Sequence, residues 1–181
     1  MLTVLVGHRG VGKTSLLKRI KSYQPWAKVW DLDAAIEEYE RLTILEIFEK
    51  YGEEYFRRLE HEVFYKIYSQ VAASSNQEHA FIALGAGFQF ELPANLRVVH
   101  IRRDTDAVGR IFLDRPRLKA GTPLEEWREC FSAREERFRQ ISSETFTLPE
   151  EFYRAPTQFL ADRANPCATQ KNESLLSVAD Q

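Results

Sequence analysis

An apolar run followed at once by a glycine-rich segment is the feature of this sequence that most restricts its fold. Residues 2–6 read LTVLV and residues 7–15 read GHRGVGKTS. A nearly all-apolar run is typical of a strand buried on both faces, as in a parallel sheet. The next residues place Leu16, Leu17 and Ile20 on one side of a predicted helix. The order of strand, glycine loop and helix therefore predicts the first unit of an α/β fold.

The spacing inside this loop indicates a phosphate-binding site. Gly7-x4-Gly12-Lys13-Thr14 has the spacing of loops whose backbone N–H groups surround a chain of phosphates. In such loops the lysine bridges the β- and γ-phosphates, and the following hydroxyl binds Mg²⁺. By chance the match would arise in on the order of one in a hundred chains of this length. We therefore expect ATP and Mg²⁺ to bind, with ATP contacting Gly10, Val11, Gly12, Lys13, Thr14 and Ser15.

Strands and helices alternate along the rest of the chain. Further strands are predicted at residues 29–30, 80–84, 98–101 and 145–148, and helices at residues 43–49, 53–73, 104–111, 122–140 and 156–163. Thr43 and Thr122 each have a glutamate three residues later, which is the pattern of a capping box at a helix start. The alternation predicts a three-layer α/β fold of the P-loop type, a parallel sheet flanked by helices. Ligands of such sheets bind at the carboxyl ends of the strands.

The length and local composition predict one domain with a mobile loop and a tail. The chain of 181 residues is long enough for a single domain with a substantial core. We predict one P-loop domain over residues 1–163 and a polar tail over residues 164–181. Residues 112–123, FLDRPRLKAGTP, combine prolines, a glycine and basic side chains, and they predict a mobile loop.

Charge and cysteine content exclude several classes of partner. A net charge of −2 provides no electrostatic reason to expect nucleic acid or a membrane as a partner. Cys130 and Cys167 match no metal or redox spacing, which favours a reducing compartment. No apolar run approaches the roughly 20 residues of a membrane span, and Met1 leads into a strand without a signal-peptide pattern. We expect a cytoplasmic monomer whose partners are small molecules.

Six segments in a fixed order resemble the shikimate kinase family. They are GHRGVGKTS, DLDAAIE (31–37), ILEIFEKYGEEYFRRLE (44–60), LGAG (84–87), RP (115–116) and AREERF (133–138). The similarity extends over approximately residues 2–160, and the run 44–60 is its most distinctive part. The resemblance implies transfer of the γ-phosphoryl group of ATP to the 3-hydroxyl of shikimate. A kinase for another small polyhydroxy acid such as gluconate, and a nucleotide-binding regulatory protein without turnover, remain alternatives.

Asp31 and Asp33 follow the predicted second strand. Two carboxylates beside a phosphate loop suit Mg²⁺, which prefers oxygen ligands, and a hydroxyl that must lose a proton. By resemblance, Asp31 holds a water bound to Mg²⁺, whereas Asp33 binds the acceptor hydroxyl and accepts its proton. The alternative is that Asp33 only caps a helix beginning at Ala34.

Arg57 and Arg134 resemble the arginines that bind the shikimate carboxylate. The helical pattern alone favours another role for Arg57, an exposed ion-pair ladder with Glu53 and Glu54. Arg134 has no acidic residue three or four positions away, so we expect it to bind an anion from elsewhere.

The turn and the aromatic residues of the expected acceptor site come from the same resemblance. The family has three consecutive glycines where this chain has Gly85-Ala86-Gly87, and the N–H of the middle residue, Ala86, helps to bind the carboxylate. A methyl group there crowds the substrate or restricts the turn. Phe48 and Phe56 match aromatic walls of the acceptor site, with core packing as the alternative.

The remaining expected site residues lie towards the C-terminus. Arg115 resembles the lid arginine that reaches over the ATP phosphates, so the residues expected to act in catalysis are Lys13, Asp33 and Arg115. A solvated basic loop is the alternative for Arg115. Arg154 resembles a residue that flanks the adenine, and Arg110 is a weaker candidate. No role is assigned to His8, His61, His79 or His100.

Overall fold

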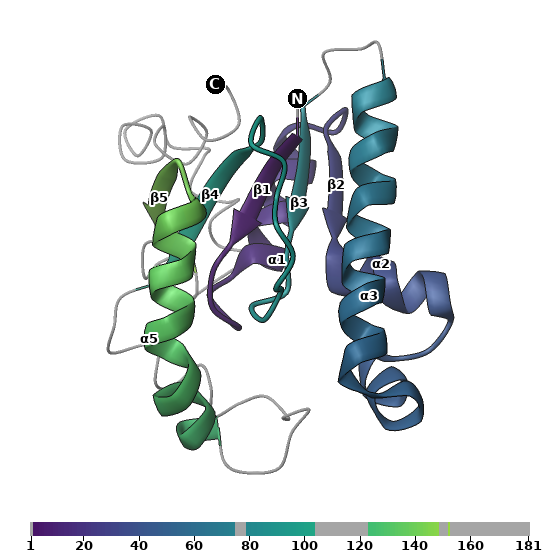
Figure 1. Ribbon diagram of the computed structural model, residues 1–181. Helices are drawn as coiled ribbons and strands as arrows, with labels where there is room; N and C mark the ends of the chain where they lie inside the picture. Colours follow the sequence, from purple (N-terminus) through teal and green to yellow (C-terminus); the bar gives the residue numbers. More distant parts are fainter. Residues whose placement is uncertain (1, 75–78, 104–122, 149–151, 153–181) are drawn as a thin grey trace.

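A parallel sheet of five strands forms the centre of the fold (Figure 1). The computed structural model describes residues 2–74, 79–103, 123–148 and 152. In this part of the chain the strands are β1 (Leu2–Val6), β2 (Lys28–Asp31), β3 (Ala80–Ala83), β4 (Arg97–Arg102) and β5 (Glu144–Thr147). They pair in the order β2-β3-β1-β4-β5, and every pairing is parallel. The strand that leads into the glycine loop therefore lies in the middle of the sheet.

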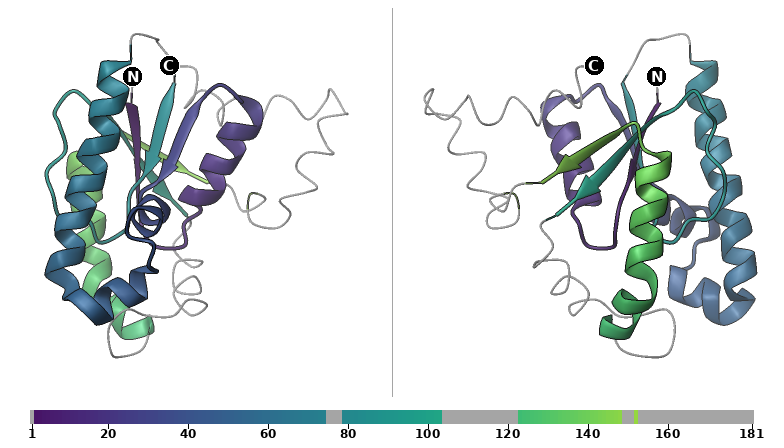
Figure 2. Two further views of the ribbon diagram at one scale, coloured as in Figure 1. Left: turned by 90° about the vertical axis from the view of Figure 1, so that its right-hand side faces the viewer. Right: turned by 60° about the vertical axis from the view of Figure 1, so that its left-hand side comes forward.

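Helices cover both faces of this sheet. They are α1 (Lys13–Tyr23), α2 (Leu32–Glu40), α3 (Ile44–Ala73) and α5 (Pro123–Ile141). Figure 2 shows α1 on one face of the sheet and α3 and α5 on the other. The three-layer fold with five parallel strands that the sequence predicted is confirmed.

Two apolar cores separate these layers. Val4 of β1 faces a core that contains Phe64 of α3 and Phe138 of α5. Its neighbour Leu5 faces the other core, which contains Leu17 of α1. Successive residues of a strand point to opposite faces, so one nearly all-apolar strand contributes to both cores. This explains why every residue from Leu2 to Val6 is buried.

The start and the interruption of α3 are both encoded locally. The hydroxyl of Thr43 accepts a hydrogen bond from the backbone N–H of Glu46, and the Glu46 carboxylate accepts one from the N–H of Thr43. This capping box was predicted and is confirmed. Gly52 has φ 81° and ψ 174°, which interrupts the helix between the two segments expected from the sequence.

Several boundaries differ from the prediction. Helix α2 begins at Leu32 rather than Ala34, with Asp31 as its N-cap residue. The interpretation of Asp33 as a helix cap is therefore wrong, because Asp33 already lies in the first turn. The helices expected at 104–111 and 156–163, most of the lid and the tail lie outside the described residues. Among the described helices, none is long and apolar enough to cross a bilayer.

Candidate functional site

The loop between β1 and α1 has the backbone geometry of a phosphate site. A Cβ atom at Gly7 would lie 2.3 Å from the carbonyl oxygen of Ile101, so only glycine fits beside β4. Gly12 is the N-cap of α1 with φ 98°, in the left-handed region that glycine tolerates best. The first N–H groups of α1 have no partner within the helix, and the helix dipole is positive at this end. The loop is therefore suited to bind an anion.

Lys13 closes this loop from within. Its Nζ atom donates hydrogen bonds to the carbonyl oxygens of Gly7, at 2.8 Å, and His8, at 3.0 Å. Both oxygens belong to the loop, so the ammonium of Lys13 lies across the loop, close to the N-terminal end of α1. The sequence pattern predicted that the ammonium of Lys13 binds the phosphates at this loop.

Thr14 and Asp31 meet at the edge of the sheet where β1 and β2 end. The Thr14 hydroxyl donates a hydrogen bond of 2.6 Å to Oδ2 of Asp31. A hydroxyl and a carboxylate are the hard oxygen donors that Mg²⁺ prefers, so these two residues fit the ion. In the described part of the chain, no group of three or more His, Cys, Asp and Glu side chains forms a metal cage. An ion here would take its other ligands from phosphates and water, as is usual for Mg²⁺.

Asp33 lies next to the turn that follows β3. A Cβ atom at Gly85 would lie 2.9 Å from its Oδ1 atom, so Gly85 leaves the space that this carboxylate occupies. Burial raises the pKa of Asp33, the negative charge of Asp31 raises it further, and Lys13 opposes the rise. A carboxylate that holds a proton more tightly than in water is a better proton acceptor.

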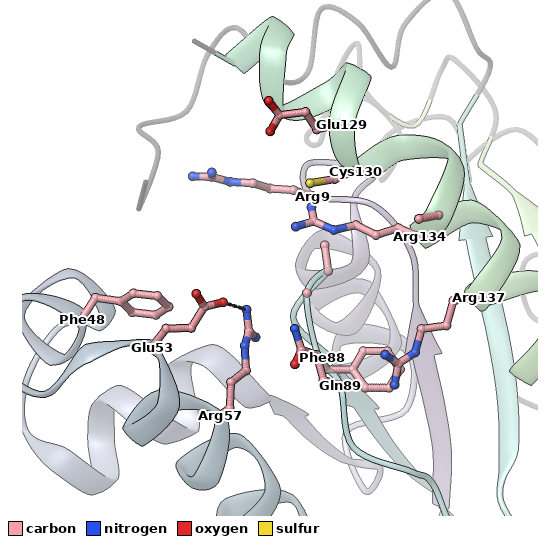
Figure 3. A pocket seen from close by; sticks show the side chains of 13 residues that line it. Arg9, Phe48, Glu53, Arg57, Phe88, Gln89, Glu129, Cys130, Arg134 and Arg137 are labelled. Atoms are coloured by element: carbon pink, nitrogen blue, oxygen red, sulfur yellow. Dashed lines mark hydrogen bonds and ion pairs between the residues drawn. The ribbon is translucent and has the colours of Figure 1, made fainter. Parts of the chain in front are cut away.

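A cavity of about 460 Å³ opens between α3 and α5 (Figure 3). Four arginines line it, and we call it the arginine cavity. Its walls consist of Arg9, Phe48, Glu53, Arg57, Ala86, Gly87, Phe88, Gln89, Glu129, Cys130, Ala133, Arg134 and Arg137. Figure 3 shows Arg57 rising from α3 on one side, with Arg134 and Arg137 extending from α5 on the other. Four guanidinium groups against two carboxylates favour an anionic ligand.

Arg57 contacts acidic residues of its own helix and also faces a candidate ligand site. It lines the arginine cavity, and its Nη2 atom pairs with Glu53 at 3.1 Å. Its Nη1 atom pairs with the buried Glu60 at 2.5 Å. The pairing expected with Glu54 is wrong, since Glu54 lies 3.7 Å from Arg58 instead. Burial raises the pKa of Glu60 to about 7, although the charge of Arg57 opposes this rise.

Arg134, which the sequence predicted to bind an anion, lines the arginine cavity together with Arg9 and Arg137, which the sequence did not single out. The guanidinium of Arg137 lies 4.7 Å from the centre of the Phe88 ring and donates a hydrogen bond to the Phe90 carbonyl. The spacing of Arg134 and Arg137, three residues apart on one helix, was the available signal for this second arginine. Arg9 was within the recognised loop, but nothing in the pattern indicated where its side chain points.

The residue that departs from the three-glycine pattern is not strained. Among the described non-glycine residues only Arg41 has a positive φ, so the left-handed conformation that would penalise alanine at position 86 does not occur. Space is restricted at the flanking glycine instead. A Cβ atom at Gly87 would lie 3.2 Å from Nη2 of Arg57. Ala86 itself lines the arginine cavity.

Phe48 and Phe56, expected either as walls of the acceptor site or as core residues, lie in different surroundings. Phe48 lines the arginine cavity, whereas Phe56 is only 4% exposed and belongs to the core, with its ring 4.8 Å from that of Phe48. Phe48 is thus a wall of the site, and Phe56 supports it from behind. Arg110, Arg115 and Arg154 lie outside the described residues.

Two histidines without an assigned role have a common neighbour. His8 and His100 are far apart in the sequence, but both are buried and lie within 3.0 and 3.6 Å of Glu135. Only the packing of the loop, β4 and α5 brings these groups together. The sequence carried no signal for this contact, since the three residues share no local spacing.

Comparisons with known proteins extend over most of the chain. A family model described as shikimate kinase matches residues 9–155. A shikimate kinase of Thermoanaerobacter pseudethanolicus is 31% identical over 148 residues, 75% of this chain and 80% of that protein. A shikimate kinase of Flavobacterium johnsoniae is 39% identical over 84 residues, and this match spans less than half of each, 46% of this chain and 45% of that protein.

A solved structure shows the same arrangement of elements. Shikimate kinase from Acinetobacter baumannii, in complex with shikimate, superposes with a TM-score of 0.66 at 21% identity. The superposition covers 90% of this chain and 92% of that one. At this level of identity the likeness supports the three-layer fold.

Proposed function

Because the chain belongs to the shikimate kinase family, we propose that it transfers the γ-phosphoryl group of ATP to the 3-hydroxyl of shikimate. The observation that carries the proposal is the position of the arginine cavity. It is lined by Arg9 from the phosphate loop and by Arg57 and Arg134 from two helices. An acid bound by these arginines lies next to the phosphates that the loop would hold. Such proximity is a large part of what catalysis of phosphoryl transfer requires.

On the nucleotide side, the loop residues Gly10, Val11, Gly12 and Ser15 would surround the phosphates with Lys13 and Thr14. Lys13 would exchange its two loop carbonyls for oxygens of the β- and γ-phosphates. Thr14 would bind Mg²⁺ directly, and Asp31, hydrogen-bonded to Thr14, would hold an ion-bound water. The ion would supply positive charge that neutralises the phosphate oxygens during transfer. From the lid, Arg115 would add a further cation, and Arg154 would flank the adenine.

On the acceptor side, Arg57 and Arg134 would bind the carboxylate of the acid from opposite walls of the arginine cavity. The N–H of Ala86 would add a hydrogen bond, which the methyl group does not prevent because the backbone there is unstrained. Glu53 and Glu60 would keep the Arg57 guanidinium oriented.

Asp33 would accept the proton of the attacking hydroxyl. It stands beside Gly85 at the mouth of the turn, and the raised pKa of its carboxyl group suits proton transfer. We further propose that the protein acts as a cytoplasmic monomer without nucleic-acid or membrane partners, in keeping with its net charge of −2.

Turnover with shikimate and with gluconate, measured with ATP and Mg²⁺, tests the proposal. We expect the wild type to phosphorylate shikimate in preference. Lys13→Ala should abolish turnover without loss of fold, because the positive charge disappears from the loop. Asp33→Asn keeps the shape but removes the proton acceptor, and it should lower kcat by about 100-fold or more while changing ATP affinity little.

Two results would contradict the assignment. A wild type that prefers gluconate would show that the acceptor is wrong. An Asp33→Asn variant with near-normal kcat would show that this carboxylate does not accept the proton. Lys18→Ala, on the exposed side of α1, is the control for removal of a lysine from the same helix.

A further inference from the structure

Three side chains on one face of α5 contact His8 of the phosphate loop. The ring of His8 stacks on Phe131, with centroids 4.3 Å apart and planes at 13°. Its Nε2 atom lies 3.0 Å from Oε2 of Glu135, and the edge of Phe138 lies against it at 5.2 Å. Residues 131, 135 and 138 are four and three positions apart, so they form one face of the helix over two turns.

The adjacent stripe of the same helix lines the arginine cavity. It consists of Cys130, Arg134 and Arg137, each one position before a residue that contacts His8. Figure 3 shows these three side chains on the cavity side of α5, with Arg9 of the loop beside Arg134. The residue that would bind the acid and the residue that contacts the loop are therefore neighbours on one rigid element.

His8 is also tied to the nucleotide side. Its carbonyl oxygen accepts a hydrogen bond of 3.0 Å from Lys13, and the next residue, Arg9, lines the arginine cavity. A shift of the His8 ring against α5 would therefore move the carbonyl that Lys13 contacts. One residue is in contact with the phosphate-binding lysine through its backbone and with the acceptor-binding helix through its side chain.

The Glu135 end of this contact is fixed by β4. Nε of Arg102 lies 2.9 Å from Oε1 of Glu135, and Nε2 of His100 lies 3.6 Å from its Oε2. His8 is 3% and Glu135 8% exposed. Arg102 compensates the carboxylate charge, so His8 need not be charged for the contact to persist. Burial lowers the pKa of His8 to about 3, which leaves a neutral ring at physiological pH.

We propose that Glu135 and His8 are positioning residues that set the register between the phosphate loop and the acceptor-binding face of α5. This inference rests on the proposed function, since alignment matters only if both substrates bind at these places. The contact holds Lys13 and Arg134 at a fixed separation, and with them the two reacting groups. Both side chains are buried, and neither lines the arginine cavity.

Steady-state kinetics on three variants tests the proposal. His8→Phe retains a ring between Phe131 and Phe138 but removes the nitrogen that meets Glu135, and Glu135→Ala removes the carboxylate. We expect each to lower kcat about tenfold or more, because misalignment of about 1 Å costs up to 100-fold. The separate affinities for shikimate and for a non-hydrolysable ATP analogue should change less than threefold. The double variant should be no slower than either single one, since both remove the same contact.

Two further variants separate positioning from general damage. Glu135→Gln retains a hydrogen-bond acceptor for His8 and should recover most of kcat. Glu136→Ala is the matched control. This exposed neighbour on α5 contacts Arg139 and Gln140 of the same helix, and its removal should leave kcat unchanged. Normal kcat in His8→Phe, multiplicative effects in the double variant, or a loss confined to shikimate affinity would each overturn the proposal.

A ligand-free readout keeps this test separate from that of the proposed function. In the NMR spectrum of His8→Phe, the amide resonances of Gly10, Gly12 and Lys13 should broaden or shift, whereas those of Ser22 at the far end of α1 should not. Unchanged loop resonances would overturn the inference. An unresponsive wild type in the shikimate assay, with shifted loop resonances, would instead contradict the proposed function alone.

Discussion

At the scale of single residues, the arginines of the arginine cavity have different surroundings. Arg57 is in contact with two carboxylates of its own helix, Glu53 and the buried Glu60. Arg134 has no acidic residue three or four positions away on α5, and a bidentate bond to an external carboxylate is therefore the more valuable interaction for it. We expect the affinity for the acid to depend more on Arg134 than on the details of the turn opposite.

The acceptor KM should accordingly rise more than tenfold in Arg134→Ala and change less than tenfold in Ala86→Gly. A charge-assisted bidentate contact is lost in the first variant. In the second, no strain is relieved, because Ala86 does not have a positive φ. The KM for shikimate at saturating ATP measures both effects. Arg139→Ala is the control, because Arg139 is an exposed arginine of the same helix. A larger effect at Ala86 than at Arg134 would contradict this ranking.

The sequence predicted correctly that some side chains far apart in the chain lie together. Thr14 and Asp31 were both expected at the metal, and their side chains are hydrogen-bonded to each other. Arg9 and Arg137 were missed, because the direction of a loop side chain and the face of a distant helix depend on tertiary packing. Arg57 pairs with Glu53 and also lines the arginine cavity, a combination that a pattern of charges along one helix cannot reveal.

At the scale of elements, the break in α3 shapes the site. Phe48 precedes Gly52, whereas Glu53 and Arg57 follow it, and all three side chains line the arginine cavity. A straight helix would carry Phe48 in another direction relative to Arg57. The combination of φ 81° and ψ 174° at Gly52 is accessible essentially to glycine alone, so this residue sets the turn of the wall.

Gly52→Ala should therefore lower the free energy of unfolding by about 1–3 kcal/mol, although nothing lies within 4 Å of the added Cβ atom. The penalty is one of backbone conformation rather than of collision. Relief of this strain would shift the helix start that carries Phe48, so the acceptor KM should rise as well. Chemical denaturation and steady-state kinetics measure the two effects, and Ser69→Ala in the regular part of α3 is the control. Equal stability of Gly52→Ala and wild type would contradict the argument.

The elements themselves were largely predictable, and their arrangement was not. Hydrophobic patterns and capping boxes placed all five strands and the described helices α1, α3 and α5 to within about two residues, with α3 expected as two segments. The start of α2 at Leu32 was missed. Aspartate is a common N-cap residue, but the cap of α2 is Asp31, and Asp33 lies in the first turn. The order β2-β3-β1-β4-β5 follows from pairing between segments far apart in the chain, which no local pattern contains.

At the scale of the whole molecule, the packing of β1 between two cores brings ionisable side chains into buried positions. His8 and His100 lie against Glu135 between the sheet and α5, and Glu60 lies under Arg57. Burial, followed by the positive charge of Arg102, lowers the pKa of His100 to about 4. Folding thus keeps this ring neutral at a pH where the unfolded chain would protonate it.

The lowered pKa of His100 predicts that the folded protein loses stability as the pH falls. The pKa of His100 is lower in the folded chain than the ordinary value of 6.5, so its contribution to stability is complete above pH 6.5 and is lost as the pH falls towards 4. One proton contributes a slope of at most about 1.4 kcal/mol per pH unit. In His100→Phe, the slope of the unfolding free energy against pH between pH 6.5 and 5 should be smaller than in wild type by up to this amount. Denaturation curves at several pH values measure it.

The exposed His61 on α3 supplies the control for this measurement. His61→Phe should retain the slope of the wild type. Identical slopes in His100→Phe and wild type would contradict the lowering of the His100 pKa by folding.

The hydrogen bonds of Lys13 to the carbonyls of Gly7 and His8 have a consequence for how tightly a nucleotide can bind. A lysine side chain loses about 2 kcal/mol of rotamer entropy when it is ordered. Here the ordering accompanies folding, since the ammonium already lies across the loop before any phosphate arrives. The incoming anion replaces two neutral acceptors around a preorganised charge, and little of its binding free energy is consumed in immobilising the residue that receives it.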